Sequence, residues 1–405
     1  MNLRHLTMAA ALLAVMAGSA AWGAGIFPGF PTVDVDEDLT GNELIPADTQ
    51  LPSGRNPQTE LLSPADIARF ARLMADSGSG NLLIGGDFGT NPWARGASFV
   101  QNGVTASYTA DRWWVTATAS AQTTRQTSSA SLVSGSAASL RFQRQDTATN
   151  VENMCIGQVL ESEDSLLTQG RKVTFSFYAR AGAAMSTVSS RVSVLIRTGT
   201  ASNQTSVLFS GGNWTGSANL VSQTQDLTST WTRYQFTGST ASDTSQIGVR
   251  ICAAFGESDG TAEATDFFEF ANAQLEVGQR ASYFQYRPPG VELVRAQRYT
   301  QAIAEPTSGV YLGFGAPSAV GTGCYVSVPL TVALRRAPSM LIDVGTFLAL
   351  ASNQAYAAVT AITSGLGTGS AIRAQVSVAA AVGNISSCGL VGQGGTGRIL
   401  LNAEL

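Results

Sequence analysis

The chain has 405 residues, 44% of them hydrophobic, so it is long enough for two or three domains with buried cores. Charged residues make up only 13%, against roughly a quarter in ordinary soluble domains. The formal net charge is −4 and the basic residues are scattered, which argues against nucleic-acid binding. The one histidine is His5, so Ser-His-Asp and Cys-His catalytic sites are excluded from the body of the chain.

The first segment, residues 1–24, has a basic start, an apolar run and small residues at its end. This is the pattern of a secretory signal peptide. The same run also suits an uncleaved apolar arm that packs against a partner during assembly. It is too short and too interrupted by glycine to predict a membrane-spanning helix with any force. The sequence leaves export and assembly anchoring open.

Residues 25–80 are predicted to be a docking and oligomerisation region. The stretch up to residue 62 lacks periodicity and predicts an extended arm. A short amphipathic helix is predicted over 63–76, with Ser63 as N-cap and Pro64 at the first helical position. Its apolar face has a spacing of i, i+3, i+4 and i+7 and comprises Ile67, Phe70, Ala71 and Met74. Because a helix this short is marginal alone, that face needs a partner, either a neighbouring domain or the same helix of other copies.

Residues 81–287 alternate apolar and polar side chains between Gly-, Ser-, Thr- and Asn-rich turns, which predicts an antiparallel sandwich. Three strands are clearest, in "KVTFSFYAR", "RVSVLIRT" and "QIGVRICAAF". Weaker strand patterns occur in "DRWWVTATA", "SLRFQRQ", "MCIGQVLE" and "WTRYQFTG". In "DFFEFANAQLEV" the apolar phase slips by one residue between Phe270 and Leu275, which predicts a β-bulge.

Residues 302–405 are rich in Gly and Ala and predict a smaller C-terminal β domain, with strands in "CYVSVPLTVAL" and "SMLIDVGTFLALA".

The four cysteines of the chain have neither C-x-x-C spacing nor histidine partners, so a zinc site is not expected. As free thiols, the four cysteines would be small, buried side chains. In an exported chain, Cys155 with Cys252 and Cys324 with Cys388 are possible pairs, although the sequence does not establish connectivity.

Four motifs occur in series: "NLLIGGDF" at 81–88, "YTADRWWV" at 108–115, "AQLEVGQRASYFQYRP" at 273–288 and "ELVRAQRYTQ" at 292–301. Together they resemble phage virion proteins of the tail-fibre and head-fibre type. "LTGNELIPADTQLPSGRNPQTELL" at 39–62 resembles the virion-proximal segment of such proteins. "VSVPLTVALRRAPSM" at 326–340 resembles a strand of their C-terminal domains.

The resemblance implies a mainly β fold: an antiparallel jelly-roll β-sandwich like that of carbohydrate-binding modules, followed by the C-terminal β domain. It also implies that a linker over 288–301 contains a short helix with Leu293, Ala296 and Tyr299 on one side. In jelly-roll modules the first and last strands meet, and oxygen ligands from both can hold a structural Ca²⁺. Our hypothesis for such a site is Asp87 with Gln274 or Asp266.

Sugars stack on aromatic rings, so exposed tryptophans are candidates for glycan binding. Trp214, in the Gly- and Asn-rich "SGGNWTGS", is the first choice and Trp93 the second. The competing interpretation is that each ring fixes its own loop. Trp113 and Trp114 are adjacent on a strand and point to opposite faces, so one of them is expected in the core.

A glycosidase needs two carboxylates across the sugar, and the candidates form two groups: Glu161, Glu163 and Asp164, and Asp266, Glu269 and Glu276. Carboxylates at strand ends are more often solvated turn residues, so we expect no enzyme.

The predicted function is a virion fibre or spike, a homotrimer attached to capsid or tail proteins, that binds host surface polysaccharide. The alternative is a secreted or periplasmic carbohydrate-binding protein of a bacterium.

Overall fold

The computed structural model describes residues 45–49, 58–62, 80–101, 103–118, 121–128, 132–145, 152–185, 190–255, 261–304, 311–317, 323–342, 347–351, 356–364, 371–378, 388–392 and 398–405. The chain divides into two compact units, Met1–Ala75 and Asp76–Leu405. In the first unit, β1 (Ile45–Thr49) pairs antiparallel with β2 (Gln58–Leu62).

The leader and the predicted helix over 63–76 lie outside the described residues. The docking face of Ile67, Phe70, Ala71 and Met74 therefore stays a prediction, as do the expected domain limits. Across the described ranges, none of the helices has the length and apolarity needed to cross a membrane.

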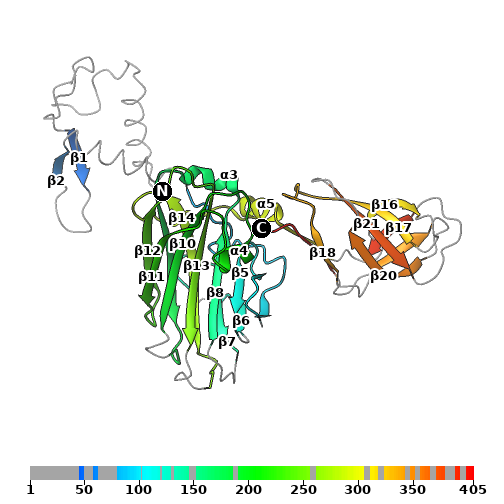
Figure 1. The fold of residues 1–405 in the computed structure, drawn as a ribbon, viewed down its shortest axis with the longest axis horizontal. Helices are drawn as coiled ribbons and strands as arrows, with labels where there is room; N and C mark the ends of the chain where they lie inside the picture. Colours follow the sequence, from blue (N-terminus) through cyan, green and yellow to red (C-terminus); the bar gives the residue numbers. More distant parts are fainter. Residues whose placement is uncertain are drawn as a thin grey trace, which may run out of the picture. The chain divides into compact units, whose positions relative to one another are not determined.

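The second unit begins with a sandwich of two six-stranded antiparallel sheets (Figure 1). One sheet has the order β11 (Ala218–Asp226), β10 (Arg191–Gly199), β13 (Gln246–Phe255), β8 (Glu152–Val159), β5 (Trp114–Ala117), β4 (Ser107–Tyr108). The other has the order β12 (Thr232–Ser239), β9 (Lys172–Ala181), β14 (Phe267–Val277), β7 (Ser139–Arg144), β6 (Ala121–Gln126), β3 (Ser98–Gln101). Short helical turns occur at α3 (Ser162–Ser165), η2 (Leu166–Thr168) and α4 (Ser206–Ser210).

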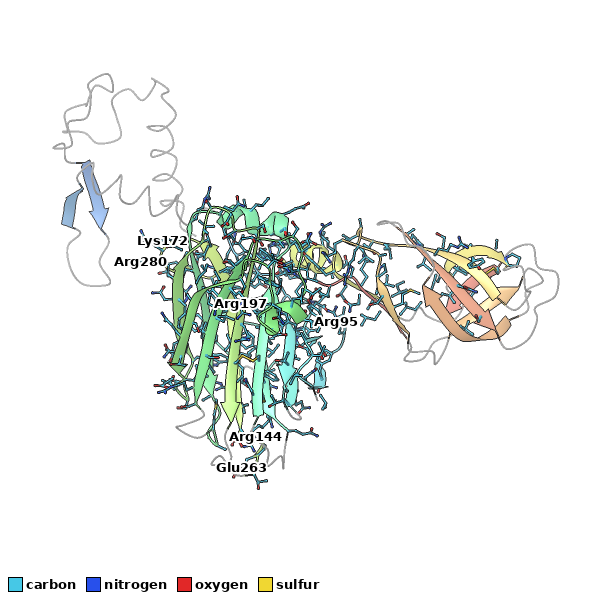
Figure 2. The ribbon with its side chains drawn as sticks, viewed as in Figure 1. Arg95, Arg144, Lys172, Arg197, Glu263 and Arg280 are labelled. Atoms are coloured by element: carbon cyan, nitrogen blue, oxygen red, sulfur yellow. A yellow bond between two sulfur atoms is a disulfide. The ribbon has the colours of Figure 1, made fainter. Side chains whose placement is uncertain are left out.

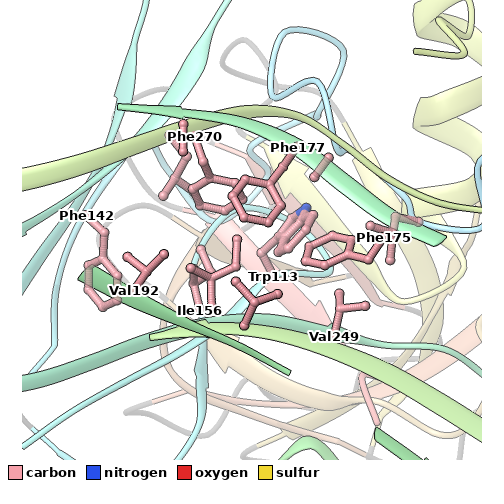
Figure 3. Packing of buried hydrophobic residues seen from close by; sticks show 14 of the residues in the cluster. Trp113, Phe142, Ile156, Phe175, Phe177, Val192, Val249 and Phe270 are labelled. Carbon is pink, nitrogen blue, oxygen red and sulfur yellow. The ribbon is translucent and has the colours of Figure 1, made fainter. Parts of the chain in front are cut away.

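The sandwich core consists of the inward side chains that the alternation predicted (Figure 3). On β9, Phe175 and Phe177 are fully buried, and they face residues such as Val192 of β10 and Val249 of β13. Each such side chain contributes about 1.5–3 kcal/mol when it leaves water. The three clearest strand predictions and the mainly β class are confirmed.

The predicted bulge in β14 is also confirmed. Its register with β9 shifts between Ala271 and Gln274, and Asn272 has a φ of 50°. The extra residue lets Leu275 return to the core while Gln274 turns to the outer face. Here the start of the sandwich meets its last strand, because the amide of Leu82 donates to the carbonyl of Leu275 at 2.8 Å.

The junction helix α5 (Pro289–Gln297) forms as expected, but with a different buried side. Ala296 and Tyr299 are buried with Ile84 of the sandwich. Leu293, predicted on the same side, is 40% exposed, and Glu292 is buried instead. The reason is electrostatic: Arg287 Nη1 lies 2.7 Å from Glu292 Oε2, and the amide of Gly85 donates to Oε1.

The remaining strands form two sheets. The first has the order β15 (Thr300–Ala304), β23 (Arg398–Asn402), β18 (Ser339–Ile342). The second is a closed barrel in the order β16 (Tyr311–Pro317), β17 (Gly323–Pro329), β21 (Ala371–Val378), β20 (Tyr356–Ser364), β19 (Phe347–Ala351), β22 (Cys388–Gly392). The predicted second strand is thus two strands, β18 and β19.

Both cysteine pairs that the sequence allowed are disulfide-bonded. Cys155 of β8 lies directly opposite Cys252 of β13 in the strand register. Cys324 of β17 is bonded to Cys388 of β22 within the barrel. Each disulfide therefore joins two strands of one sheet.

Candidate ligand-binding face of the sandwich

The outer face of the β12–β9–β14–β7–β6–β3 sheet carries one row of side chains that crosses several strands. The strand register places Arg180 of β9 opposite Glu269 of β14 and Glu269 opposite Arg141 of β7. Thr124 of β6 continues the row beyond Arg141, and Trp231, next to the start of β12, lies against Arg180 at its other end. We call these five residues the arginine row.

Glu269 holds the centre of the arginine row. Its side chain is 0% exposed, between Arg141 and Arg180, which are 22% and 20% exposed. Arg141 Nε donates to Oε1 and Arg180 Nε to Oε2, both at 2.7 Å. Two charge-assisted contacts of this length fix both guanidinium groups in place. The carboxylate is thereby covered, and the two cations form the accessible part of the row.

Aromatic rings support both guanidinium groups. The Arg141 guanidinium carbon lies 3.8 Å from the centroid of the Phe267 ring, and that of Arg180 lies 5.2 Å from the Trp231 ring. Stacking on a ring orients the flat guanidinium and leaves its edges for hydrogen bonds. The row thus presents rigid, planar donors.

Polar and aromatic side chains flank the arginine row. Half-buried Tyr178 and Arg233 lie on one side, and Arg233 Nη2 donates to Ser176 Oγ at 3.2 Å. Gln143 and Gln122, opposite each other in β7 and β6, lie on the other side. Guanidinium donors, amide groups and aromatic rings that converge on one area are typical of a binding site for a polar ligand.

The outer face of the other sheet is covered around its centre. Trp114 is fully buried there, and it packs against Phe209 of α4 with ring centroids 5.6 Å apart. The Cys155–Cys252 disulfide and Leu405 belong to the same buried cluster. Trp113 on the opposite side lies in the sandwich core, so both tryptophans of the pair are structural.

The two tryptophans chosen from the sequence are not exposed. Trp214 is 3% exposed, lies edge-on to Phe209 and donates from Nε1 to the carbonyl of Thr205 at 3.1 Å. Trp93 is 6% exposed and donates from Nε1 to the carbonyl of Phe88 at 2.8 Å. The expectation of an exposed Trp214 is wrong, because Gly- and Asn-rich sequence here builds a packed turn. Each ring fixes its own loop.

The two alternative partners of Asp87 in the Ca²⁺ hypothesis, Gln274 and Asp266, lie far apart. The carboxylate of Asp266 lies 3.4 Å from the guanidinium of Arg144. Arg144 is at one end of the sandwich, and Lys172, whose carbonyl accepts a hydrogen bond from Gly278 just after β14, is at the other end (Figure 2). Eight positions of strand separate Asp266 from Gln274, a span of about 25 Å. The Gln274 amide nitrogen donates to Glu276 at 2.8 Å.

Asp87, the remaining candidate, is bound within its own turn. Its carboxylate accepts a hydrogen bond of 2.6 Å from Thr90 Oγ1. Burial raises the pKa of Asp87, against the lowering effect of the Thr90 hydrogen bonds, and Glu292 raises it further. Among the described residues, no three His, Cys, Asp or Glu side chains are grouped to hold a metal. Gln274 is not one of these residue types, so a Ca²⁺ site of Asp87 with Gln274 stays a prediction.

Four of the six carboxylates weighed as glycosidase groups are engaged with neighbours: Glu161, Asp266, Glu269 and Glu276. Glu161 lies 3.0 Å from Arg298 Nη2 and 2.8 Å from Arg335 Nε. Glu276 accepts a hydrogen bond of 2.6 Å from Ser282 Oγ. Burial raises the pKa of Asp164, with Arg295 opposing it. Glu269 belongs to the arginine row.

Sequence reasoning missed Arg141 and Arg180, and it did not select Trp231 among the tryptophans. A signal was present, since arginines at outward positions of central strands are unusual in a chain with only 13% charged residues. Their common row was not visible, because 128 positions separate Arg141 from Glu269 and 89 separate Arg180 from it.

Comparison with known proteins gives weak likenesses only. No family model matches the chain, and no curated protein matches it. Among solved structures, the enzymatically active domain of Bacteriophage CBA120 tailspike protein 4 is 10% identical over 49% of this chain and 21% of its own, with a TM-score of 0.29.

Carbohydrate-binding modules are also among the similar structures. A CBM61 module in complex with β-1,4-galactotriose is 11% identical over 48% of this chain and 97% of its own, with a TM-score of 0.26. The CBM22-1 xylan-binding domain of Paenibacillus barcinonensis is 13% identical over 41% of this chain and 87% of its own, with a TM-score of 0.25. Scores of this size transfer no function, so the functional argument rests on the side chains above.

Proposed function

We propose that this chain is a non-enzymatic phage virion protein, a fibre or spike, whose sandwich binds host surface glycan along the arginine row. The observation that carries the glycan part is the row itself: fixed donors and aromatic rings side by side on the outer face of one sheet. The virion part is supported by the motif series from "NLLIGGDF" to "ELVRAQRYTQ".

The engagement of the acidic side chains supports a binding role. A retaining or inverting glycosidase needs one carboxylic acid and one carboxylate facing each other across the sugar. In the arginine row the only carboxylate, Glu269, is covered by two guanidinium groups. Such a group positions its neighbours and is poorly placed to attack a sugar or protonate it.

Titration of the purified protein with a panel of host surface polysaccharides tests glycan binding. Trp231→Ala and Tyr178→Ala remove flat aromatic surface and leave the pairs with Glu269 intact, so affinity should fall about threefold to tenfold for each. Tyr283→Ala is the matched control, because Tyr283 is 95% exposed and lies outside the row. Unchanged affinity in both the Trp231 and the Tyr178 variant would refute the site.

Intact-mass spectrometry of purified phage particles from the source culture tests the virion role. The protein should be present in particles with Met1 or Asn2 at its N-terminus. Light scattering of the full chain should give three copies if the predicted helix over 63–76 mediates trimerisation. A monomer absent from particles would contradict the virion role.

The second candidate is a secreted or periplasmic carbohydrate-binding protein of a bacterium. The two disulfides, Cys155–Cys252 and Cys324–Cys388, favour it, because such bonds persist in oxidising compartments. The same mass measurement separates the two candidates. This one requires the protein in periplasm or medium, beginning near residues 22–25.

A further inference from the structure

The arginine row carries more positive than negative charge. Two arginines share the single carboxylate of Glu269, and Arg233 stands in the neighbouring row. The other carboxylate on the outer face of β14 is Glu276, which is buried and bound by Ser282. The chain as a whole has a net charge of −4, so this excess is local.

Donors remain on both guanidinium groups. Each arginine contacts Glu269 through Nε and Nη2. A guanidinium has five N–H groups, two of them on Nη1. Within the described part of the chain, no hydrogen bond involves Nη1 of Arg141 or Arg180. Both side chains are about one-fifth exposed, so these edges are open to a ligand.

We infer that the ligand of the arginine row is an acidic glycan, whose sugar carboxylates bind at Arg141 and Arg180. This inference rests on the proposed glycan-binding function and names the class of glycan. Planar guanidinium groups match carboxylates with paired hydrogen bonds, which neutral hydroxyl groups do not supply.

The placement of the two arginines on different strands suits a polymer that crosses the sheet. Arg141 and Arg180 lie on strands either side of β14, so their backbones are about 10 Å apart. Both guanidinium groups reach inward to the same carboxylate, so they lie closer together than their backbones do, and neighbouring acidic groups of one polysaccharide chain can meet both. The ring of Phe267 supports Arg141, and the ring of Trp231 supports Arg180.

The experiment pairs each acidic polysaccharide of the panel with its carboxyl-reduced form, which has the same backbone without the charge. The acidic form should bind at least tenfold more tightly, and its affinity should fall as salt rises. Equal binding of both forms would overturn the inference and leave glycan binding in place. Binding of neither form anywhere on the panel would overturn the proposed function as well.

Two charge variants test the site directly. Gln143→Glu adds a negative charge beside the row without touching the Glu269 pairs. It should weaken binding of the acidic form about fivefold to tenfold more than it weakens binding of the reduced form. Thr224→Glu is the matched control, because exposed Thr224 lies in β11 of the other sheet. Equal effects of the two variants would contradict binding at the row.

Discussion

Arg112 and Glu404 form a buried ion pair although 292 positions separate them in the chain. The backbone amide of Arg112 also donates to Glu404 Oε1 at 3.2 Å. Arg95 reaches the same oxygen at 3.2 Å, and the Arg112 guanidinium lies 3.5 Å from the Tyr299 ring centroid. The segment after β23 is therefore tied to the sandwich by charge.

Replacement of Glu404 by Gln should destabilise the protein strongly. The change leaves the guanidinium groups of Arg95 and Arg112 buried without this carboxylate, and the loss of one partner of a buried pair costs about 3–5 kcal/mol. Urea unfolding followed by tryptophan fluorescence measures the effect. Asp226→Asn is the control: its pair with Arg191 is largely exposed, so its midpoint should not move. Equal midpoints for the two variants would contradict this account.

Asp111 should make stability depend on pH in the same cluster. Burial raises the pKa of Asp111 to about 6 from an ordinary 3.8, opposed by Arg95 and the amide of Ala94, with Glu404 raising it further. The folded protein therefore binds this proton more tightly than the unfolded chain does. The stabilising contribution is fully present below about pH 4 and is lost as pH rises through about 6.

The comparison of wild type with Asp111→Asn isolates this effect from other acidic groups, Glu404 among them. Thermal unfolding between about pH 4 and pH 7 should show the melting temperature of wild type rising relative to that of the variant as pH falls. Arg112, whose pKa is lowered by burial but raised overall by the Glu404 carboxylate, stays charged in this range, and Tyr108, whose pKa burial raises to about 12, stays neutral. A constant difference across the range would show that Asp111 does not titrate there.

The strands were predictable because a sandwich buries one face of each strand. In β9, Val173, Phe175 and Phe177 alternate with polar residues, and these three apolar side chains all lie in the core, as the period of two predicts. The bulge was predictable for the same reason, since the one-residue phase slip before Leu275 has no other geometric meaning in a strand. The local sequence pattern was therefore enough to predict the strands and which face of each is buried.

The arginine row and the Arg112–Glu404 pair were not predictable, because they join residues brought together only by strand order. Trp214 was misjudged since turn composition does not reveal whether a ring packs inward, as it does on Phe209. Glu292 was missed because a buried carboxylate needs a partner, and Arg287 is recognised as that partner only once the helix is docked.

Removal of the Cys155–Cys252 disulfide should destabilise the sandwich. The cysteines are 97 positions apart, and the chain-entropy model gives about 4–5 kcal/mol for a loop of that size. Cys155→Ala with Cys252→Ala should lower the unfolding midpoint reported by core tryptophan fluorescence. Cys324→Ala with Cys388→Ala, in the barrel, should leave that signal in place. If the Cys324/Cys388 variant lowered this midpoint and the Cys155/Cys252 variant did not, the assignment of the Cys155–Cys252 disulfide to sandwich stability would be contradicted.

Glu292→Ala and Leu293→Ala test which side of α5 is buried. Loss of the Glu292 carboxylate leaves Arg287 and the amide of Gly85 without this acceptor, which costs about 1–3 kcal/mol. Amide hydrogen exchange in α5 should then become faster. Leu293 is exposed, so its truncation should change stability by no more than about 0.5 kcal/mol. If the Leu293 variant were the more damaging, the apolar side expected from sequence would be the docking side.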